Sequence, residues 1–547
     1  MSPANRPLRY AAVATLLLLW IYMSGLWAGD EVLERAKFDM GDRTYEIGMD
    51  RLVNSSFDWG TYPRRFPIES LTPLPPGRPR IQPRIQSRGR ETGVAFDDKL
   101  LSHRREVRDA FLKAWMSYKE LAWMRDELTP LSGAGKDTFG GWAATLIDNL
   151  DTLWIMDLKE EFSEAVEAVA TLDWANTTAT GCNIFETTIR HLGGLLAAYD
   201  LSGERVLLIK AIELGDMLYA GFDTPNHLPV SWLDFQKAKD GLLVGDTHQP
   251  SASAGSMSLE FTRLSQLTGD PKYYDAITRV TTLLNQSQEE TRLPGIWPTF
   301  LDTRNGNFKD GNSFTLGALA DSLYEYLPKM HAFLGNLDPV YEKLAKRALT
   351  GIKEHLLFRP MLPGRDNILY SGEAHIEEDG NVTLVPEVQH LGCFTGGMFG
   401  LSGRIFGSDE YVDLATRLTW GCIHAYLSFP TGIMPEIFNM FACPGLDPCD
   451  WDEAKWQEEG NMALRAGFRN VRDPSYLLRP EAIESIFILY RITGIRGYGD
   501  MAYVLFQAIQ KATQTKYANA AIKNVTVDSH PTHLDSMEVS LLVPLKS

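Results

Sequence analysis

Apolar residues recur at helical spacing through most of the chain from Ser102 onward. This spacing predicts thirteen helices, near residues 103–125, 143–156, 159–171, 185–201, 204–219, 256–267, 272–284, 314–333, 338–356, 391–405, 409–426, 478–493 and 498–515. Strand-like runs are short, as in residues 381–385, and are expected to be hairpin arms in the connecting loops. A structure built from helix pairs needs a fourteenth helix after residue 538, but residues 539–547 are too few and contain Pro544.

Glycine-containing turns separate these helices at a regular interval. They lie at Gly203, Gly269, Gly335, Gly407 and Gly494, which are 66, 66, 72 and 87 residues apart. A period of this size indicates a repeated unit, here a helical hairpin plus a return connection. Hairpins that close into a ring bring side chains from equivalent helices to its axis. We therefore predict one all-α toroid within residues 98–547.

Several of the repeated helices carry an acidic residue near their start. Glu186 and Arg190 are four residues apart and share one helix face, although Asn183 and Glu186 also fit a helix-capping pair. Asp321 and Glu325 are an acidic pair at the same spacing, which destabilises a helix and so favours a functional role. Two further acids are candidates. Glu260 interrupts an otherwise apolar helix face, and Glu436 follows a turn-like segment.

The segment Arg479-Pro480-Glu481-Ala482-Ile483-Glu484 opens a helix with proline at its first position. Both glutamates then lie in the first turn, where unpaired N–H groups and the helix dipole favour ionised carboxylates. An ionised carboxylate is suited to be a general base. The alternative is that Glu481 and Glu484 are simply favourable residues for a helix start.

Aromatic residues accompany these acids, a combination typical of a sugar-binding site. Glycosidic cleavage needs one carboxyl group to protonate the leaving oxygen and another to activate water or attack the sugar. The sequence contains no zinc-binding spacing, no phosphate-binding glycine loop and no GxSxG segment. The net charge of −17 disfavours nucleic acid as a partner, because phosphate binding requires a basic surface.

The N-terminal region has the features of a membrane-anchored lumenal protein. The uncharged apolar run Ala11 to Ala28 follows two arginines and predicts a transmembrane signal anchor over residues 11–28, with a cytoplasmic tail of residues 1–10. A cleaved signal peptide is the alternative. Residues 29–97 are expected to be an extended, unpacked stalk, because they are rich in proline and arginine. Five glycosylation sequons favour the secretory lumen: Asn54, Asn176, Asn285, Asn381 and Asn524.

The chain contains five cysteines, too few for a disulfide scaffold of this length. Cys393 and Cys422 lie on successive predicted helices, and Cys443 and Cys449 flank a tight proline-containing loop. We expect both pairs to be bridged and Cys182 to be free, although spacing alone does not fix the connectivity.

Six segments together resemble the class I α-1,2-mannosidases, glycoside hydrolase family 47, over about residues 100–538. They are residues 141–154, 185–190, 258–261, 320–326, 390–394 and 478–485. The resemblance implies an (α/α)7 barrel and a Ca2+-dependent inverting hydrolase. It also implies that the substrate is terminal α-1,2-linked mannose of high-mannose N-glycans on glycoproteins.

The resemblance assigns a role to each candidate residue. Glu186 takes the proton-donor position, Asp321 is a further catalytic acid and alternative donor, Glu481 takes the base position, and Glu436 matches another assigned acid. Five residues match sugar- or water-contacting positions: Arg190, Glu260, Glu325, Arg479 and Glu484. The pair Cys393–Cys422 matches the family disulfide.

Two positions refine what the resemblance implies. Leu319 matches the Golgi-type members, whereas the endoplasmic-reticulum type has arginine there. This implies a single-pass type II membrane protein of the Golgi, or of the endoplasmic reticulum, with a lumenal catalytic domain.

After Glu538 the chain diverges from the family, which continues with another inner helix and a threonine that binds Ca2+. Ca2+ is therefore implied by the family, with no metal ligand assigned here. A non-catalytic glycan-binding or quality-control homologue is the alternative function.

Overall fold

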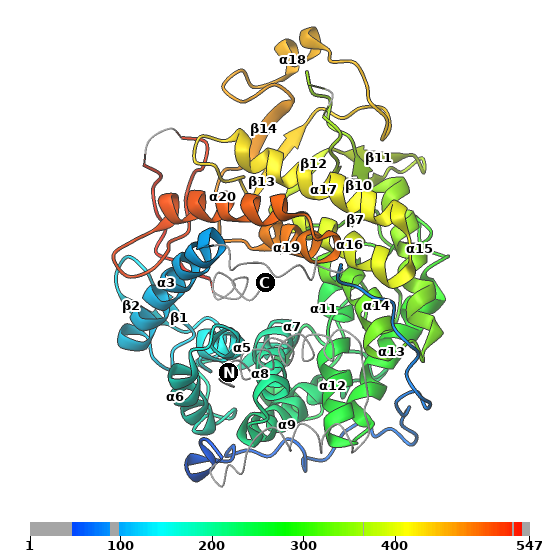
Figure 1. Cartoon of the computed structure of the whole chain (residues 1–547). Helices are drawn as coiled ribbons and strands as arrows, with labels where there is room; N and C mark the ends of the chain where they lie inside the picture. Colours follow the sequence, from blue (N-terminus) through cyan, green and yellow to red (C-terminus); the bar gives the residue numbers. More distant parts are fainter. Residues whose placement is uncertain (1–45, 88–97, 365, 528–529, 539–547) are drawn as a thin grey trace, which may run out of the picture.

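The computed structural model describes residues 46–87, 98–364, 366–527 and 530–538. Within these ranges the chain forms helical hairpins arranged in a ring (Figure 1). The outer helices are α3 (Asp98–Leu121), α6 (Lys159–Ala170), α9 (Arg205–Tyr219), α13 (Lys272–Ser287), α15 (Pro339–His355), α17 (Asp409–Ser428) and α20 (Arg496–Thr513). The inner helices are α5 (Leu150–Ile155), α8 (Gly193–Ser202), α12 (Ser258–Thr268), α14 (Asp321–Phe333), α16 (Thr395–Phe406) and α19 (Glu481–Thr493).

Each inner helix packs against an outer helix, and successive inner helices pack against one another from α5 round to α19. The chain turns from inner to outer helix at the five predicted glycines, which have left-handed φ values of 62° to 75°. Glycine adopts this conformation without steric cost and commonly ends a helix. The mainly helical fold and the repeated hairpin predicted from the sequence are thus confirmed.

Short strands occupy the end of the ring at which the inner helices begin. One sheet has β10 (Glu373–Ile376) between β7 (Ser313–Thr315) and β11 (Val382–Val385), and another has β13 (Ile437–Met440) between β12 (Glu387–Gln389) and β14 (Phe468–Asp473). Two-stranded ribbons join β1 (Glu127–Thr129) to β2 (Ala134–Lys136), β3 (Gly181–Asn183) to β4 (Trp232–Asp234), β5 (Gln249–Pro250) to β6 (Phe300–Leu301), and β8 (Leu357–Phe358) to β9 (Tyr370–Ser371).

Some predicted helices begin later or are interrupted. The helix predicted over 314–333 begins at Asp321, because residues 313–315 pair with β10 instead. The helix predicted over 185–201 consists of α7 (Ile184–Thr187), a π-helical turn (Thr188–Leu192) and α8. A π-helical turn inside a helix is often found at a functional site. The remaining short helices are η1 (Met49–Arg51), α4 (Ala144–Asp148), η3 (Ala220–Phe222), α10 (Phe235–Lys239), α11 (Ser251–Gly255), η4 (His390–Phe394) and α18 (Glu453–Glu459).

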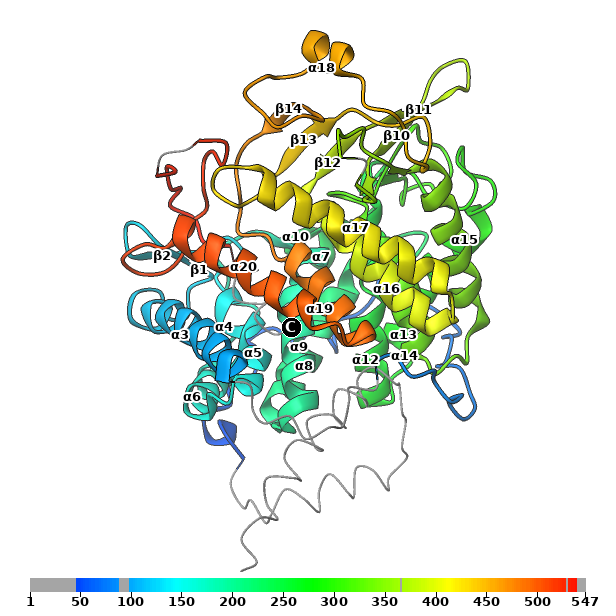
Figure 2. The same cartoon turned by 45° about the horizontal axis from the view of Figure 1, so that its top comes forward.

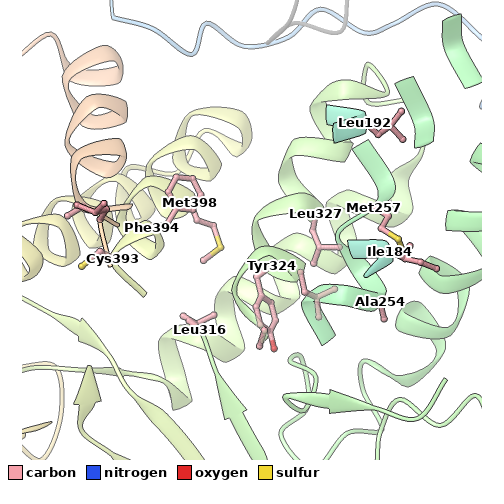
Figure 3. Close-up of a cluster of buried hydrophobic side chains, with 14 of the residues drawn as sticks. Ile184, Leu192, Ala254, Met257, Leu316, Tyr324, Leu327, Cys393, Phe394 and Met398 are labelled. Carbon is pink, nitrogen blue, oxygen red and sulfur yellow. The ribbon is translucent and has the colours of Figure 1, made fainter. Parts of the chain in front are cut away.

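A continuous hydrophobic core holds the inner helices to their neighbours. Figure 3 shows part of it, in which Ile184 of α7 lies beside Met257, and Phe394 lies near Met398 of α16. Helices that bury this much apolar surface are fixed in position, so the acidic side chains at their starts are held in place by the core behind them.

Residues 46–87 form an extended segment that packs along the ring (Figures 1 and 2). The backbone N–H groups of Arg65 and Phe66 donate to the Asp223 carboxylate at 2.8 Å, and that of Thr72 donates to Asp275 at 2.8 Å. The expected extended conformation is present in this part, but the expectation that it is unpacked is wrong. The contacts that hold it are backbone hydrogen bonds to distant carboxylates, which leave no periodic pattern in the sequence.

The proposed tail and anchor, residues 1–28, lie outside the described residues, as does part of the proposed stalk. Within the described part, no helix has the length and apolar character needed to cross a bilayer.

Both expected disulfides are present, Cys393–Cys422 and Cys443–Cys449, and Cys182 is a buried free thiol. The first links residues 29 apart and the second residues 6 apart. Because a disulfide restricts the unfolded chain more when it closes a longer loop, Cys393→Ser with Cys422→Ser should cost about 3.5 kcal/mol of unfolding free energy. The matched control, Cys443→Ser with Cys449→Ser, should cost about 2 kcal/mol. Urea denaturation of both double variants measures this, and an equal loss would contradict it.

Candidate active site

Glu186 lies at the start of the interrupted helix α7–α8. The Asn183 side chain caps this helix by accepting a hydrogen bond from the backbone N–H of Glu186 at 3.0 Å. One turn later, Nε of Arg190 donates to Oε2 of Glu186 at 2.9 Å. The same guanidinium lies 3.8 Å from the Asp148 carboxylate and 5.0 Å from the centre of the Phe139 ring. Glu186 is therefore both a capped helix residue and a member of an ion pair.

Asp321 and Glu481 are the first residues of two inner helices, α14 and α19. Burial, together with the nearby carboxylates of Glu325 and Glu481, raises the pKa of Asp321 to about 7. Burial also raises the pKa of Glu481 to about 7, although the Arg479 charge opposes this. Burial therefore opposes the ionisation of Glu481 that the helix start was predicted to favour.

His390 lies against Glu481 and was not predicted as a site residue. Its Nδ1 is 3.5 Å from Oε2 of Glu481, and neither atom has a hydrogen-bond partner among the described residues. Burial lowers the pKa of His390 to about 4, so the ring is neutral at pH 7. Its Nε2 lies 2.9 Å from the Tyr426 hydroxyl. The unpaired Glu481 oxygen is thus a buried acceptor without a donor, which is unusual and typical of functional sites.

Arg479 links three carboxylates. Its Nε donates to Oε2 of buried Glu436 at 3.1 Å, and its guanidinium lies 3.6 Å from Oε2 of Glu538. Glu436 also accepts the backbone N–H of Leu477 at 2.8 Å. Burial alone would lower the pKa of Arg479, but Glu436, Glu481 and Glu538 raise it overall. Glu538 was not predicted as a site residue, because the sequence before it has no helical periodicity.

A cavity of about 410 Å³ extends along the inner helices. It is lined by Glu260, Glu325 and Glu484 together with the aromatic rings of Phe394 and Phe487. Lys329 Nζ donates to Glu325 Oε1 at 2.9 Å, and the Tyr326 hydroxyl donates to Glu260 Oε1 at 2.8 Å. A cavity that combines apolar walls with a few fixed polar groups is suited to hold a sugar.

The burial of the Glu260 carboxyl group lowers the stability of the folded protein. Its Oε2 is buried without a hydrogen-bond partner, and burial raises its pKa to about 7. A carboxyl group whose pKa is raised on folding destabilises the protein above pH 7 and has no such effect below the unfolded pKa of about 4.5. Glu260→Gln should therefore raise the melting temperature by about 2 °C at pH 8 and leave it unchanged at pH 4.5.

The control for this prediction is Glu378→Gln, which changes an exposed carboxylate in the same way. Differential scanning calorimetry at both pH values compares the two variants with the wild type. Equal melting temperatures for Glu260→Gln and wild type at pH 8 would contradict the buried, destabilising carboxylate.

The ring brings the candidate residues into one electrostatic group. The charges of Glu325 and Glu481 raise the pKa of Asp321, the charge of Glu325 also raises the pKa of Glu481, and the charge of Arg479 lowers both pKa values. Glu538 connects this group to the Glu186–Arg190 pair, because it lies within the influence of both Arg479 and Arg190. The group therefore provides buried carboxyl groups with pKa values near 7, which can donate and accept protons at neutral pH, and its member Glu325 also lines the cavity.

The described residues do not form a calcium site of their own. Within them, no three His, Cys, Asp or Glu side chains are placed to hold one ion. Ca2+ usually takes six to eight oxygen ligands.

Residues 110–542 match the family described as glycosyl hydrolase family 47. The chain belongs to this family. Relatives of this family 47 chain include a mannosyl-oligosaccharide 1,2-α-mannosidase of Arabidopsis thaliana, 33% identical over 79% of this chain and 72% of that protein. The endoplasmic reticulum mannosyl-oligosaccharide 1,2-α-mannosidase of Homo sapiens is 34% identical over 87% of this chain. The chain spans 62% of the length of that human enzyme.

A solved structure supports the family 47 fold. The α-1,2-mannosidase from Trichoderma reesei is 30% identical, with a TM-score of 0.74 over 82% of this chain and 92% of that one. A mannosyl-oligosaccharide α-1,2-mannosidase IA of Spodoptera frugiperda is 30% identical over 91% of this chain and 70% of that protein. The family assignment agrees with the acid-lined ring and identifies the protein as a glycoside hydrolase.

Proposed function

We propose that this protein is a mannosyl-oligosaccharide 1,2-α-mannosidase that removes terminal α-1,2-linked mannose from high-mannose N-glycans. The proposal is supported by family membership together with the placement of Asp321 and Glu481 at the starts of inner helices α14 and α19, where both carboxyl groups are buried and the Glu481 charge raises the pKa of Asp321. The relatives named above have this activity in their names.

Asp321 is the better candidate for the proton donor. No cation is recorded in contact with its carboxyl group within the described residues, and its pKa of about 7 keeps much of it protonated at neutral pH. Glu186, the other candidate, accepts a hydrogen bond from the Arg190 guanidinium. A proton held on Asp321 can be given to the oxygen of the leaving sugar.

Glu481 is proposed as the general base. Its unpaired Oε2 can accept a proton from a water molecule, which then attacks the anomeric carbon from the face opposite the leaving group. Arg479, held by Glu436, places a positive charge beside Glu481 and favours the ionised form of Glu481. Arg190, Glu260, Glu325 and Glu484 then contact the sugar or the attacking water.

Calcium, location and subgroup are further parts of the proposal. The family resemblance suggests that Ca2+ assists sugar binding, so mannose release should fall in EDTA and return with added Ca2+. The anchor over residues 11–28 suggests a type II membrane protein, and Leu319 suggests the Golgi-type subgroup. Fluorescence microscopy of the tagged chain in eukaryotic cells tests this, and an endoplasmic-reticulum pattern would contradict the Golgi assignment.

Incubating the detergent-purified full chain with a high-mannose oligosaccharide tests the activity itself. We expect release of free mannose from α-1,2 linkages and none from α-1,3- or α-1,6-linked mannobiose. Binding of the oligosaccharide without mannose release would instead support the non-catalytic alternative.

A further inference from the structure

Exposed apolar side chains lie on the loops at the end of the ring where inner helices begin. They are Trp232, Leu242, Val244, Phe300 and Leu319, and between 41% and 63% of each residue's surface is exposed. We call these five residues the apolar rim. Large exposed apolar side chains that lie together usually mark a binding surface.

Hydrogen bonds join the loops of the apolar rim to one another and to the inner helices. The backbone N–H of Ile184, in α7, donates to Ser231 O at 3.1 Å, and the N–H of Ala252, in α11, donates to Leu319 O at 2.9 Å. Four further hydrogen bonds join the loops between these points. The backbone N–H of Ser231 donates to Asp246 Oδ2 (2.7 Å), and that of Asp246 donates to Thr303 Oγ1 (2.9 Å). The Thr303 hydroxyl donates to Gln249 Oε1 (2.9 Å), and the backbone N–H of Ser251 donates to Thr299 O (2.9 Å). The rim is therefore one connected structure fixed to α7 and α11.

Trp232 is held in place on one side and open on the other. It pairs across the β3–β4 ribbon with Asn183, the residue that caps the helix of Glu186. Its indole lies over Gly181, where an added Cβ would be only 2.7 Å from Nε1 of Trp232 and 2.2 Å from Leu233 O. The residue is nevertheless 49% exposed. The absence of a side chain at Gly181 lets the indole lie against the ribbon and present its remaining surface.

Phe300 extends this surface toward the next inner helix. It lies on β6, opposite Pro250, which directly precedes α11, and its ring centre is 6.4 Å from that of His248. Both aromatic residues therefore lie on ribbons that lead into short helices, α7 and α11, the first of which contains Glu186. An occupant of this surface must leave the acids accessible, which favours the oligosaccharide itself over a second protein.

We infer that Trp232 and Phe300 bind mannose residues of the same oligosaccharide, beyond the residue that is cleaved. A sugar ring has an apolar C–H face that packs on a flat aromatic side chain, and its hydroxyl groups stay in water at an exposed site. The inference rests on the proposed function, because it assumes an oligosaccharide substrate. In this proposal the apolar rim recognises the branched glycan, and the acids cleave the terminal mannose.

The test compares Trp232→Ala and Phe300→Ala with Trp420→Ala, which removes a Trp that is 40% exposed on outer helix α17. Each change is made in full-length Glu481→Gln protein, and isothermal titration calorimetry measures the Kd for a high-mannose oligosaccharide and for α-1,2-linked mannobiose. Trp232→Ala should weaken oligosaccharide binding about tenfold relative to mannobiose binding. Phe300→Ala should act in the same direction, and Trp232→Phe should restore most of the affinity.

If Trp232→Ala binds the oligosaccharide as tightly as Trp420→Ala does, the inference is wrong. A parallel loss of affinity for both ligands would also overturn it, because it would indicate damage to the acid-lined site or to folding. Failure of the proposed function is seen separately, as absence of mannose release from mannobiose by the wild-type chain.

Discussion

Glu481→Gln should reduce kcat/KM for mannose release by about 10²–10⁴-fold while leaving the protein folded. The substitution keeps the shape of the side chain but removes the group that accepts a proton from water. Because burial raises the pKa of Glu481 to about 7, the carboxylate is costly to bury, and its replacement should not lower the melting temperature. Initial rates on a high-mannose oligosaccharide and calorimetric melting temperatures measure the two effects.

The matched control is Glu410→Gln. Glu410 also lies in the first turn of a helix, α17, but it is exposed and pairs with Lys353 on the outside of the ring. It should keep wild-type kcat/KM. If Glu481→Gln retained wild-type activity, Glu481 would not be the general base, and the reaction would need a different acceptor for the proton of water.

Arg479→Met should destabilise the protein by about 3–5 kcal/mol at pH 8. The arginine contacts Glu436 and Glu538 and lies close enough to Glu481 to influence its ionisation, so its removal takes a stabilising positive charge away from buried carboxylates. The pKa values of Glu481 and Glu538 in the folded protein should then rise further. Since protonation removes the buried charge, the destabilisation should shrink as the pH falls toward 5.

Urea denaturation at pH 8 and pH 5 measures this dependence. The control is Arg347→Met, which breaks a partly exposed pair with Glu289 in which both guanidinium hydrogen bonds are near 3 Å. An exposed pair of this kind contributes about 0–1 kcal/mol. Equal losses for the two variants, or a loss for Arg479→Met that does not depend on pH, would contradict the buried network.

The helices, their turns and most of the acid positions could be predicted from the sequence because their signals are local. The spacing of apolar residues indicates the buried face of a helix. A glycine directly after a helix indicates a left-handed turn, as at Gly203 and Gly269. The cap formed by Asn183 and the pair formed by Glu186 and Arg190 depend on residues three and four positions apart, and the structure contains both.

The remaining features depend on contacts between distant residues. The pKa of Glu481 follows from burial by other helices, which outweighs the local effect of a helix start. His390 and Glu538 join the site through partners 91 and 59 residues away along the chain, Glu481 and Arg479. The segment 46–87 is held by carboxylates such as Asp223, more than 150 residues away. No periodic pattern accompanies such contacts.

The most direct test of the account is to follow mannose release from a high-mannose oligosaccharide by ¹H NMR. If Asp321 protonates the leaving oxygen while Glu481 activates a water molecule on the opposite face, the first mannose to appear is the β-anomer, and Glu481→Gln releases it about 10²–10⁴ times more slowly. Release of the α-anomer first, or binding of the oligosaccharide without any release by the wild-type chain, would contradict the account.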